Sequence, residues 1–240
     1  MITNHADVVG SLLRPPDLLE AQRQFDSGAL SPPRFKEIED HAVDEAIALH
    51  KSVGLEIVTD GEMRRRSFQS QMTAAVSGFG EHDLDAFLWG DWYDEQGVHR
   101  KRRPRQLGAN AKLKRLRYLA AEEFSYLKGK TRQISKITLP SPGLWANFWS
   151  PKYSRHAYPT LDSFLAEIVK ILREEVAELV RLGASYIQID APQYGLFLDA
   201  KTRGFYEREG WSLDQWLEQG IDLDNAVMDG FPGTTFGFHI

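Results

Sequence analysis

Two acidic residues each follow a short apolar stretch, and both could help to bind a cation. Asp190 ends the stretch Tyr-Ile-Gln-Ile-Asp at 186–190, and Glu62 comes shortly after the stretch 55–59. Such stretches predict buried strands, and functional side chains of parallel α/β folds gather at the carboxyl ends of strands. Two carboxylates at neighbouring strand ends can bind one cation. We therefore predict that Asp190 and Glu62 are functional, the alternative being that they cap helices or form ion pairs.

The elements that carry these acids repeat one order of helix, glycine, strand and acid. Apolar residues at helical spacing predict a helix over 34–53, and Gly54 stands where a helix end favours glycine. A second helix is predicted over 161–182, and Gly183 follows it. Strands are predicted near residues 7, 56, 136, 187 and 236. This order is typical of an α/β fold whose parallel sheet is built from βα units.

Between about residues 81 and 132 this alternation is lost, which predicts an inserted arm made of a hairpin and a helix. The range contains a basic run over 99–117, which we interpret as a solvated surface. Contact with an anionic substrate tail is one alternative, and nucleic acid is another. The run lacks the repeated aromatic residues that single-strand binding requires. The three arginines 64–66 are predicted to form ion pairs with nearby acids.

The composition favours a single globular domain over 1–240 and excludes several classes of protein. The chain has 240 residues, of which 42% are hydrophobic, and its net charge of -5 gives no general attraction to nucleic acid or to an anionic membrane. Its mean hydropathy is -0.40, and no apolar run is long enough to span a bilayer. There is no cysteine and no secretory signal. We expect a cytoplasmic protein without disulfides.

Four motifs, taken in order, resemble the cobalamin-independent methionine synthase family. They are Val-Gly-Ser-Leu-Leu-Arg-Pro at 9–15, Thr-Asp-Gly-Glu-x-Arg-Arg at 59–65, Tyr-Pro at 158–159 and Tyr-Ile-Gln-Ile-Asp-Ala-Pro at 186–192. The likeness is to the C-terminal catalytic barrel of that family and to stand-alone relatives of the barrel. It implies a TIM-type (β/α)8 barrel that moves a methyl group from 5-methyltetrahydrofolate to a thiol such as homocysteine. It also implies a zinc ion that holds the substrate as a thiolate.

The resemblance implies roles for the residues that bind the amino-acid part of the substrate. Gly10 and Ser11 match the turn that holds the carboxylate of homocysteine. Glu62 and Asp190 match the acids that hold its ammonium group. Arg14 either anchors an anion or pairs with an acid. These matches agree with the chemistry of the groups, because backbone N–H groups of a turn bind anions and carboxylates bind cations.

The resemblance also implies an aromatic site and a metal site. Trp145 and Trp149 lie where the family stacks the pterin of the folate. His239 matches the first residue of the family's His-x-Cys pair of zinc ligands, and the sequence ends at Ile240. Because a structural or catalytic zinc needs three or four protein ligands, His239 alone cannot hold the metal.

The number of predicted strands indicates whether the barrel is complete in this chain. A closed barrel needs eight strands and about 250 residues without insertions, and only five strands are predicted. We therefore expect a TIM-type barrel that is incomplete in this chain, with about five βα units and a truncated C-terminal side. The alternatives are a non-catalytic remnant, or half of a split barrel completed by a partner chain. An alkyl-thiol transferase of the coenzyme M type and a uroporphyrinogen-decarboxylase-like enzyme are also alternatives.

Overall fold

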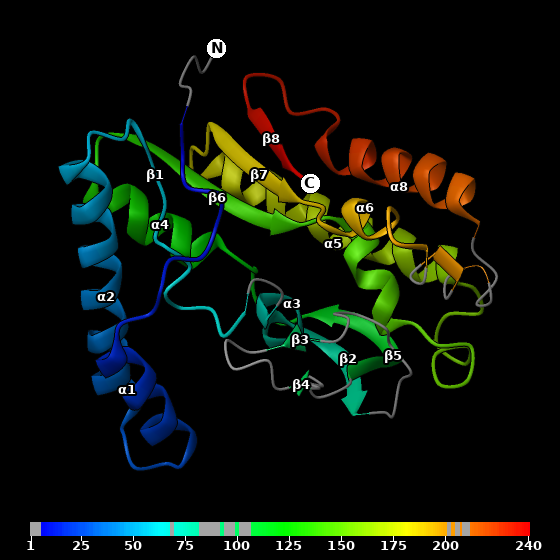
Figure 1. Ribbon diagram of the computed structural model, residues 1–240, viewed down its shortest axis with the longest axis horizontal. Helices are drawn as coiled ribbons and strands as arrows, with labels where there is room; N and C mark the ends of the chain where they lie inside the picture. The colour runs from blue at the N-terminus through cyan, green and yellow to red at the C-terminus, as the bar shows by residue number, and fades with distance from the viewer. Residues whose placement is uncertain are drawn as a thin grey trace.

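The structure is a computed structural model that describes residues 6–67, 70–81, 92–93, 99–100, 107–200, 203–204, 207 and 212–240. The helices are α1 (Pro16–Asp26), α2 (Pro32–Ser52), α3 (Ser70–Ala75), α4 (Ala121–Lys130), the 3-10 helix η1 (Pro142–Phe148), α5 (Leu161–Arg181), α6 (Gln193–Leu196) and α8 (Leu213–Met228). The strands are β1 (Ile57–Val58), β2 (Val76–Glu81), β3 (Trp92–Tyr93), β4 (His99–Arg100), β5 (Leu107–Arg115), β6 (Ile134–Pro140), β7 (Tyr186–Asp190) and β8 (Thr235–His239). Figure 1 shows their arrangement.

A parallel sheet in the order β1-β6-β7-β8 carries the fold. Its register places Pro140, Asp190 and His239 side by side at the carboxyl ends of three strands. The predicted α/β class is therefore confirmed, as are the strands expected near residues 56, 136, 187 and 236. The closure of the barrel and its incompleteness stay predictions.

The strand predicted at residues 7–11 is wrong, because this segment forms no ladder with the sheet. Its backbone carbonyls are held by side chains instead. Lys136 Nζ donates to the carbonyl of Val8, and Gln188 Nε2 donates to the carbonyl of Val9 at 2.6 Å. Figure 1 shows this blue N-terminal segment passing β6 on its way to α1. We call residues 7–12 the N-terminal segment.

The two faces of the sheet differ in chemistry because alternate residues of a strand point to opposite faces. Ile137, Leu139, Ile187 and Ile189 are buried in the main core, which also holds the apolar stripe of α5. The alternating set on the opposite face is polar and equally buried: Lys136, Thr138, Gln188 and Asp190. Parallel sheets are usually apolar on both faces, so this polar face indicates a site.

The predicted hairpin is confirmed, but both predicted bounds of the arm are wrong, because β2 begins at Val76 and α4 does not belong to the arm. β2 and β5 pair in antiparallel fashion and leave the parallel sheet. Helix α4 belongs to the α/β layer, because Tyr126 donates to Asp44 of α2 at 3.1 Å and Leu127 is buried in the core beneath α2.

Residues 101–106 of the basic run lie outside the described residues. Within the described part of the run, Arg115 pairs with Glu174 at 3.0 Å. None of the helices that the structure describes is long and apolar enough to cross a membrane.

The long helix α5, which covers β7, begins with a reciprocal cap. Thr160 Oγ1 accepts a hydrogen bond from Ser163 N at 3.1 Å, and Ser163 Oγ accepts one from Thr160 N at 3.2 Å. We expect Thr160→Ala to lower the unfolding free energy by about 1 kcal/mol, because a helix N–H loses its acceptor. Thr160→Ser keeps the hydroxyl and should stay close to wild type. Urea unfolding of the three proteins checks this, and equal losses in both variants would contradict it.

Candidate functional site

Glu62 lies in a tight turn directly after β1, and the turn fixes its position. The side chain of Asp60 accepts a hydrogen bond from Glu62 N at 2.9 Å, and Glu62 O accepts one from Arg65 N at 3.1 Å. Glu62 has a φ of 54°, in the left-handed region that residues other than glycine rarely adopt. Such strained backbone concentrates at functional positions, where the surrounding structure enforces it.

Three side chains hold the Glu62 carboxylate. Ser11 Oγ donates to Oε2, while Thr138 Oγ1 and Arg65 Nη1 donate to Oε1 at 2.6 and 2.9 Å. Burial would raise the pKa of Glu62, but Arg65 and the hydrogen bonds from Ser11 and Thr138 lower it below its usual value. Glu62 is therefore an ionised carboxylate, although only 2% of it is exposed.

Arg65 is the buried cation of this network. Its Nε donates to Glu123 at 3.0 Å, and its two Nη atoms donate to Glu62, to the hydroxyl of Thr138 and to the carbonyl of Thr138. Burial would lower the pKa of Arg65, but Glu123, Glu62 and Asp60 raise it above its usual value. One guanidinium thus bonds to two acids, Glu62 and Glu123, and Asp60 acts on it through charge alone. The predicted ion pairs of arginines 64–66 are confirmed for Arg65 and also for Arg64 and Arg66.

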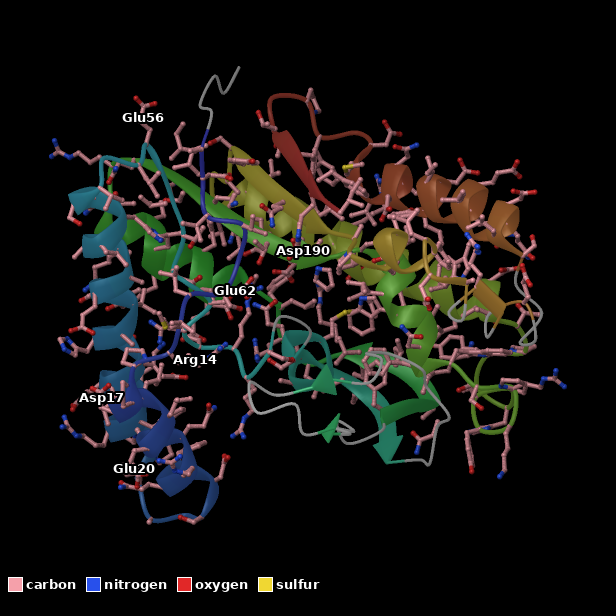
Figure 2. All side chains as sticks on the ribbon, viewed as in Figure 1. Arg14, Asp17, Glu20, Glu56, Glu62 and Asp190 are labelled. Atoms are coloured by element: carbon pink, nitrogen blue, oxygen red, sulfur yellow. The ribbon has the colours of Figure 1, made fainter. Side chains whose placement is uncertain are left out.

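Asp190 stands at the end of β7, beside His239 at the end of β8. Its Oδ1 accepts from Gln188 Nε2 at 2.6 Å and lies 3.1 Å from His239 Nδ1. Burial raises the pKa of Asp190 above its usual value, and the charge of Glu62 acts in the same direction. β6 lies between the strands that precede the two acids, so the prediction of neighbouring strand ends is wrong, but Glu62 reaches Thr138 of β6, the strand next to β7. Figure 2 shows Glu62 and Asp190 in the middle of the molecule, with Glu56, Asp17 and Glu20 away from them.

The N-terminal segment lies against Glu62. Leu12 N donates to Gly61 O at 3.1 Å, and a Cβ added at Gly10 would lie 3.6 Å from Glu62 Oε1. Gly10 and Ser11 are thus brought to the same place as Glu62, in agreement with their predicted proximity. Arg14 donates Nη2 to the backbone carbonyls of Glu62 and Arg65 and so braces the turn. Roles in substrate binding stay predictions for Gly10, Ser11 and Arg14.

The predicted aromatic residues lie on and after η1. Trp145 is 1% exposed and packs against Phe79 and Phe148, with ring centroids 6.0 and 5.6 Å away. Trp149 donates its Nε1 to the carbonyl of Tyr158 at 3.0 Å. Both rings are therefore tied into the protein interior in this structure. Their role in stacking a pterin stays a prediction.

His239 has one feature of a metal ligand. A metal-bound imidazole typically donates its second N–H to a carboxylate, and Asp190 is placed to accept one from Nδ1. This arrangement leaves Nε2 for a ligand. Across the ranges that the structure describes, however, no group of three or more His, Cys, Asp or Glu side chains could hold a metal ion. The described residues therefore do not form a zinc site by themselves.

Sequence reasoning misses four residues of the site. It treats Thr138, Lys136 and Gln188 only as parts of strands, and it places Glu123 in the arm. A signal for the first three is present, because polar residues alternate with isoleucine and leucine in both predicted strands. Such alternation indicates that one face of a parallel sheet is polar. The partnership of Glu123 with Arg65 spans 58 residues and leaves no signal in local spacing.

Comparison with known proteins finds relatives that are named methionine synthase, although no family model matches the chain. The chain is 31% identical over 186 residues to a methionine synthase of Pyrococcus horikoshii, covering 77% of this chain and 51% of that protein. The chain thus spans about half the length of the curated relatives that it matches.

Solved structures show the same fold. A putative vitamin-B12-independent methionine synthase from Listeria monocytogenes superposes with a TM-score of 0.73 and 20% identity, covering 99% of this chain and 65% of that chain. A B12-independent methionine synthase from Shewanella sp. W3-18-1, in complex with selenomethionine, superposes with a TM-score of 0.64 and 20% identity. It covers 88% of this chain and 54% of the Shewanella chain.

Proposed function

Because this chain is related to the cobalamin-independent methionine synthase family, we propose that its polar sheet face binds the amino-acid part of a thiol substrate such as homocysteine for methyl transfer. Glu62 and Asp190 hold the ammonium group in this proposal. The turn at Gly10 and Ser11 holds the carboxylate. At the level of the whole protein, the proposal includes 5-methyltetrahydrofolate as methyl donor and zinc, which lowers the pKa of a bound thiol. His239 is the metal ligand that this chain would contribute.

The observation that carries the proposal is that Glu62 and Asp190 are both buried and that each has an acceptor position with no partner among the described residues. Glu62 accepts three hydrogen bonds, and a carboxylate has about four acceptor positions, so one remains. The contacts of Asp190 within the described residues both end on Oδ1, which leaves Oδ2 for a ligand. Among the described residues, Arg65 is the cation that bonds to the Glu62 carboxylate, and Glu123 shares it, whereas Arg14 bonds to backbone carbonyls. An ammonium group between the two acids would supply the positive charge that the site lacks.

Two alternatives find less support. A decarboxylase-like function needs an arginine that faces a substrate, and the hydrogen bonds of Arg14 and Arg65 go to protein groups. A transferase of the coenzyme M type would bind a thiol that carries a sulfonate and no amine. Two buried acids suit such an anion poorly.

Calorimetric titration with L-homocysteine and with L-methionine tests the proposal. We expect both to bind wild-type protein, and Glu62→Gln and Asp190→Asn to weaken binding about tenfold, because each removes one charge-assisted contact to the ammonium group. Glu56→Gln is the matched control, since Glu56 is exposed and lies away from the two acids (Figure 2). Unfolding of each variant is measured alongside. Equal binding of 2-mercaptoethanesulfonate, or unchanged affinity in both site variants, would contradict the proposal.

A further inference from the structure

We propose that Gln188 is a positioning residue, which sets the rotamer of Asp190 and ties it to the N-terminal segment. Asp190, which would bind the ammonium group of an amino acid, and the turn of Gly10 and Ser11, which would bind its carboxylate, would then be positioned by the same side chain. This inference rests on the proposed function for its ligand. It goes beyond that function by assigning a role to a residue that acts only through its neighbours.

The hydrogen bonds of Gln188 fix the orientation of its amide. Oε1 accepts from Lys136 Nζ at 2.7 Å, and Nε2 donates to Val9 O and to Asp190 Oδ1, each at 2.6 Å. Lys136 offers only donors and a backbone carbonyl only accepts, so the opposite orientation of the amide would lose both contacts. Both amide hydrogens are used. Gln188 is 5% exposed, so water cannot readily replace these partners.

Lys136 holds both the amide oxygen of Gln188 and the N-terminal segment. It is fully buried, and its three donors go to Asp7 Oδ2 at 2.9 Å, to Val8 O and to Gln188 Oε1. An ammonium group has three donors, so all of them are satisfied. A buried lysine with every donor used is held in one geometry. The N-terminal segment is thus fixed to β6 through Lys136 and to β7 through Gln188.

Hydrogen bonds link Gln188 and the N-terminal segment to both Glu62 and Asp190. Gln188 holds Val9 O, and two residues further on Ser11 Oγ donates to Glu62. The same Gln188 amide holds Asp190 Oδ1 and so directs Oδ2 away from it. One amide therefore lies between the turn of Gly10 and Ser11 and the carboxylate of Asp190. Displacing it disturbs both ends of the site at once.

Gln188→Glu is the sharpest test, because it changes one NH2 group into an oxygen. The new carboxylate can still accept from Lys136, but it can no longer donate to Val9 O or Asp190 Oδ1. Gln133→Glu is the matched control: Gln133 also donates Nε2 to a backbone carbonyl, that of Leu55, and lies at the opposite end of β6. The same chemical change is thus made on the same strand layer, far from Asp190.

The first measurement needs no ligand. We expect hydrogen exchange in the peptide that covers residues 7–14 to speed up at least tenfold in Gln188→Glu, and to stay at the wild-type rate in Gln133→Glu. The Leu12 amide, which donates to Gly61 O, is a direct reporter. Exchange in peptides of α2 shows whether each variant is folded. Unchanged exchange at 7–14 in Gln188→Glu overturns the inference, whatever the binding data show.

The second measurement is a double-mutant cycle on L-methionine affinity. We expect Gln188→Glu to weaken binding about tenfold in the wild-type background. In the Asp190→Asn background it should weaken binding by less than tenfold, because the part of its effect that acts through Asp190 is lost and only the part that acts through Val9 and the turn of Gly10 and Ser11 remains. Additive losses would show a general structural role and overturn the inference. If wild-type protein binds no amino acid, the proposed function fails, and the exchange result alone decides whether Gln188 couples the segment to the site.

Discussion

Replacing Arg65 by methionine is expected to lower the unfolding free energy by about 3–5 kcal/mol, the largest loss that we expect from a single substitution in this protein. Arg65 is 2% exposed, and its guanidinium is shared by Glu62 and Glu123. Methionine fills similar space but leaves both carboxylates buried without their cation. Removing one partner from a buried ion pair costs far more than the intact pair contributes, because the remaining charge is neither solvated nor paired.

Arg66 offers a matched control for this change. It is the next residue, and it also pairs with an acid, Asp26, but 55% of its side chain is exposed. We expect Arg66→Met to cost about 0–1 kcal/mol, the usual range for a surface pair. Arg65→Lys should lie between the two, because lysine keeps the charge but lacks the planar fork that reaches Glu123 and Thr138 together. Urea unfolding at neutral pH measures all three. Equal losses for Arg65→Met and Arg66→Met would contradict the buried network.

The parts of the fold that the sequence predicts correctly are those set by local periodicity. The helix predicted over 161–182 is α5, which runs over Leu161–Arg181, because its apolar stripe repeats at helical spacing and Gly183 follows. The strand ends that carry Glu62 and Asp190 follow from the same kind of pattern. The amino-acid sequence alone therefore suffices to place both acids at one edge of the sheet.

The parts that the sequence does not predict depend on contacts between distant residues. The segment 7–11 has the composition of a strand, but side chains more than 120 residues away, on β6 and β7, hold its carbonyls. Spacing cannot show that a lysine and a glutamine replace a neighbouring strand. Likewise, sequence pattern assigns α4 to the arm because the insertion before it interrupts the alternation, whereas its packing on α2 makes it part of the α/β layer.

The same limit explains why the sequence does not reveal the network beneath Glu62. Thr138 and Glu123 come from separate regions of the chain and look ordinary in their own surroundings, and Ser11 is predicted to bind substrate rather than Glu62. They meet because the turn after β1 points Glu62 and Arg65 toward the polar face of β6. A buried arginine with two acids is visible only once the sheet register is known. What can be anticipated is the polarity of the face, since polar residues alternate along β6 and β7.

Asp60 leads to a prediction about pH that local spacing does not suggest. Burial raises the pKa of Asp60 from 3.8 to about 6, and the charge of Glu123 adds to the effect. Its Oδ1 accepts from Glu62 N, while its buried Oδ2 has no hydrogen-bond partner among the described residues. Between about pH 4 and pH 6 the folded protein therefore holds a proton that the unfolded chain releases. The stability contributed by this proton is present at low pH and is lost as the pH rises through about 6.

We expect Asp60→Asn to remove this dependence. Asparagine keeps the acceptor for Glu62 N but cannot ionise, so its stability relative to wild type should rise by about 2 kcal/mol between about pH 4.5 and about pH 7.5. Urea unfolding across that range measures the difference between the two proteins, which cancels other groups such as Glu39, whose pKa burial raises to about 7. Glu56→Gln controls for the loss of one negative charge at an exposed position. A difference that stays constant with pH would show that Asp60 is already ionised throughout this range and that burial does not raise its pKa into it.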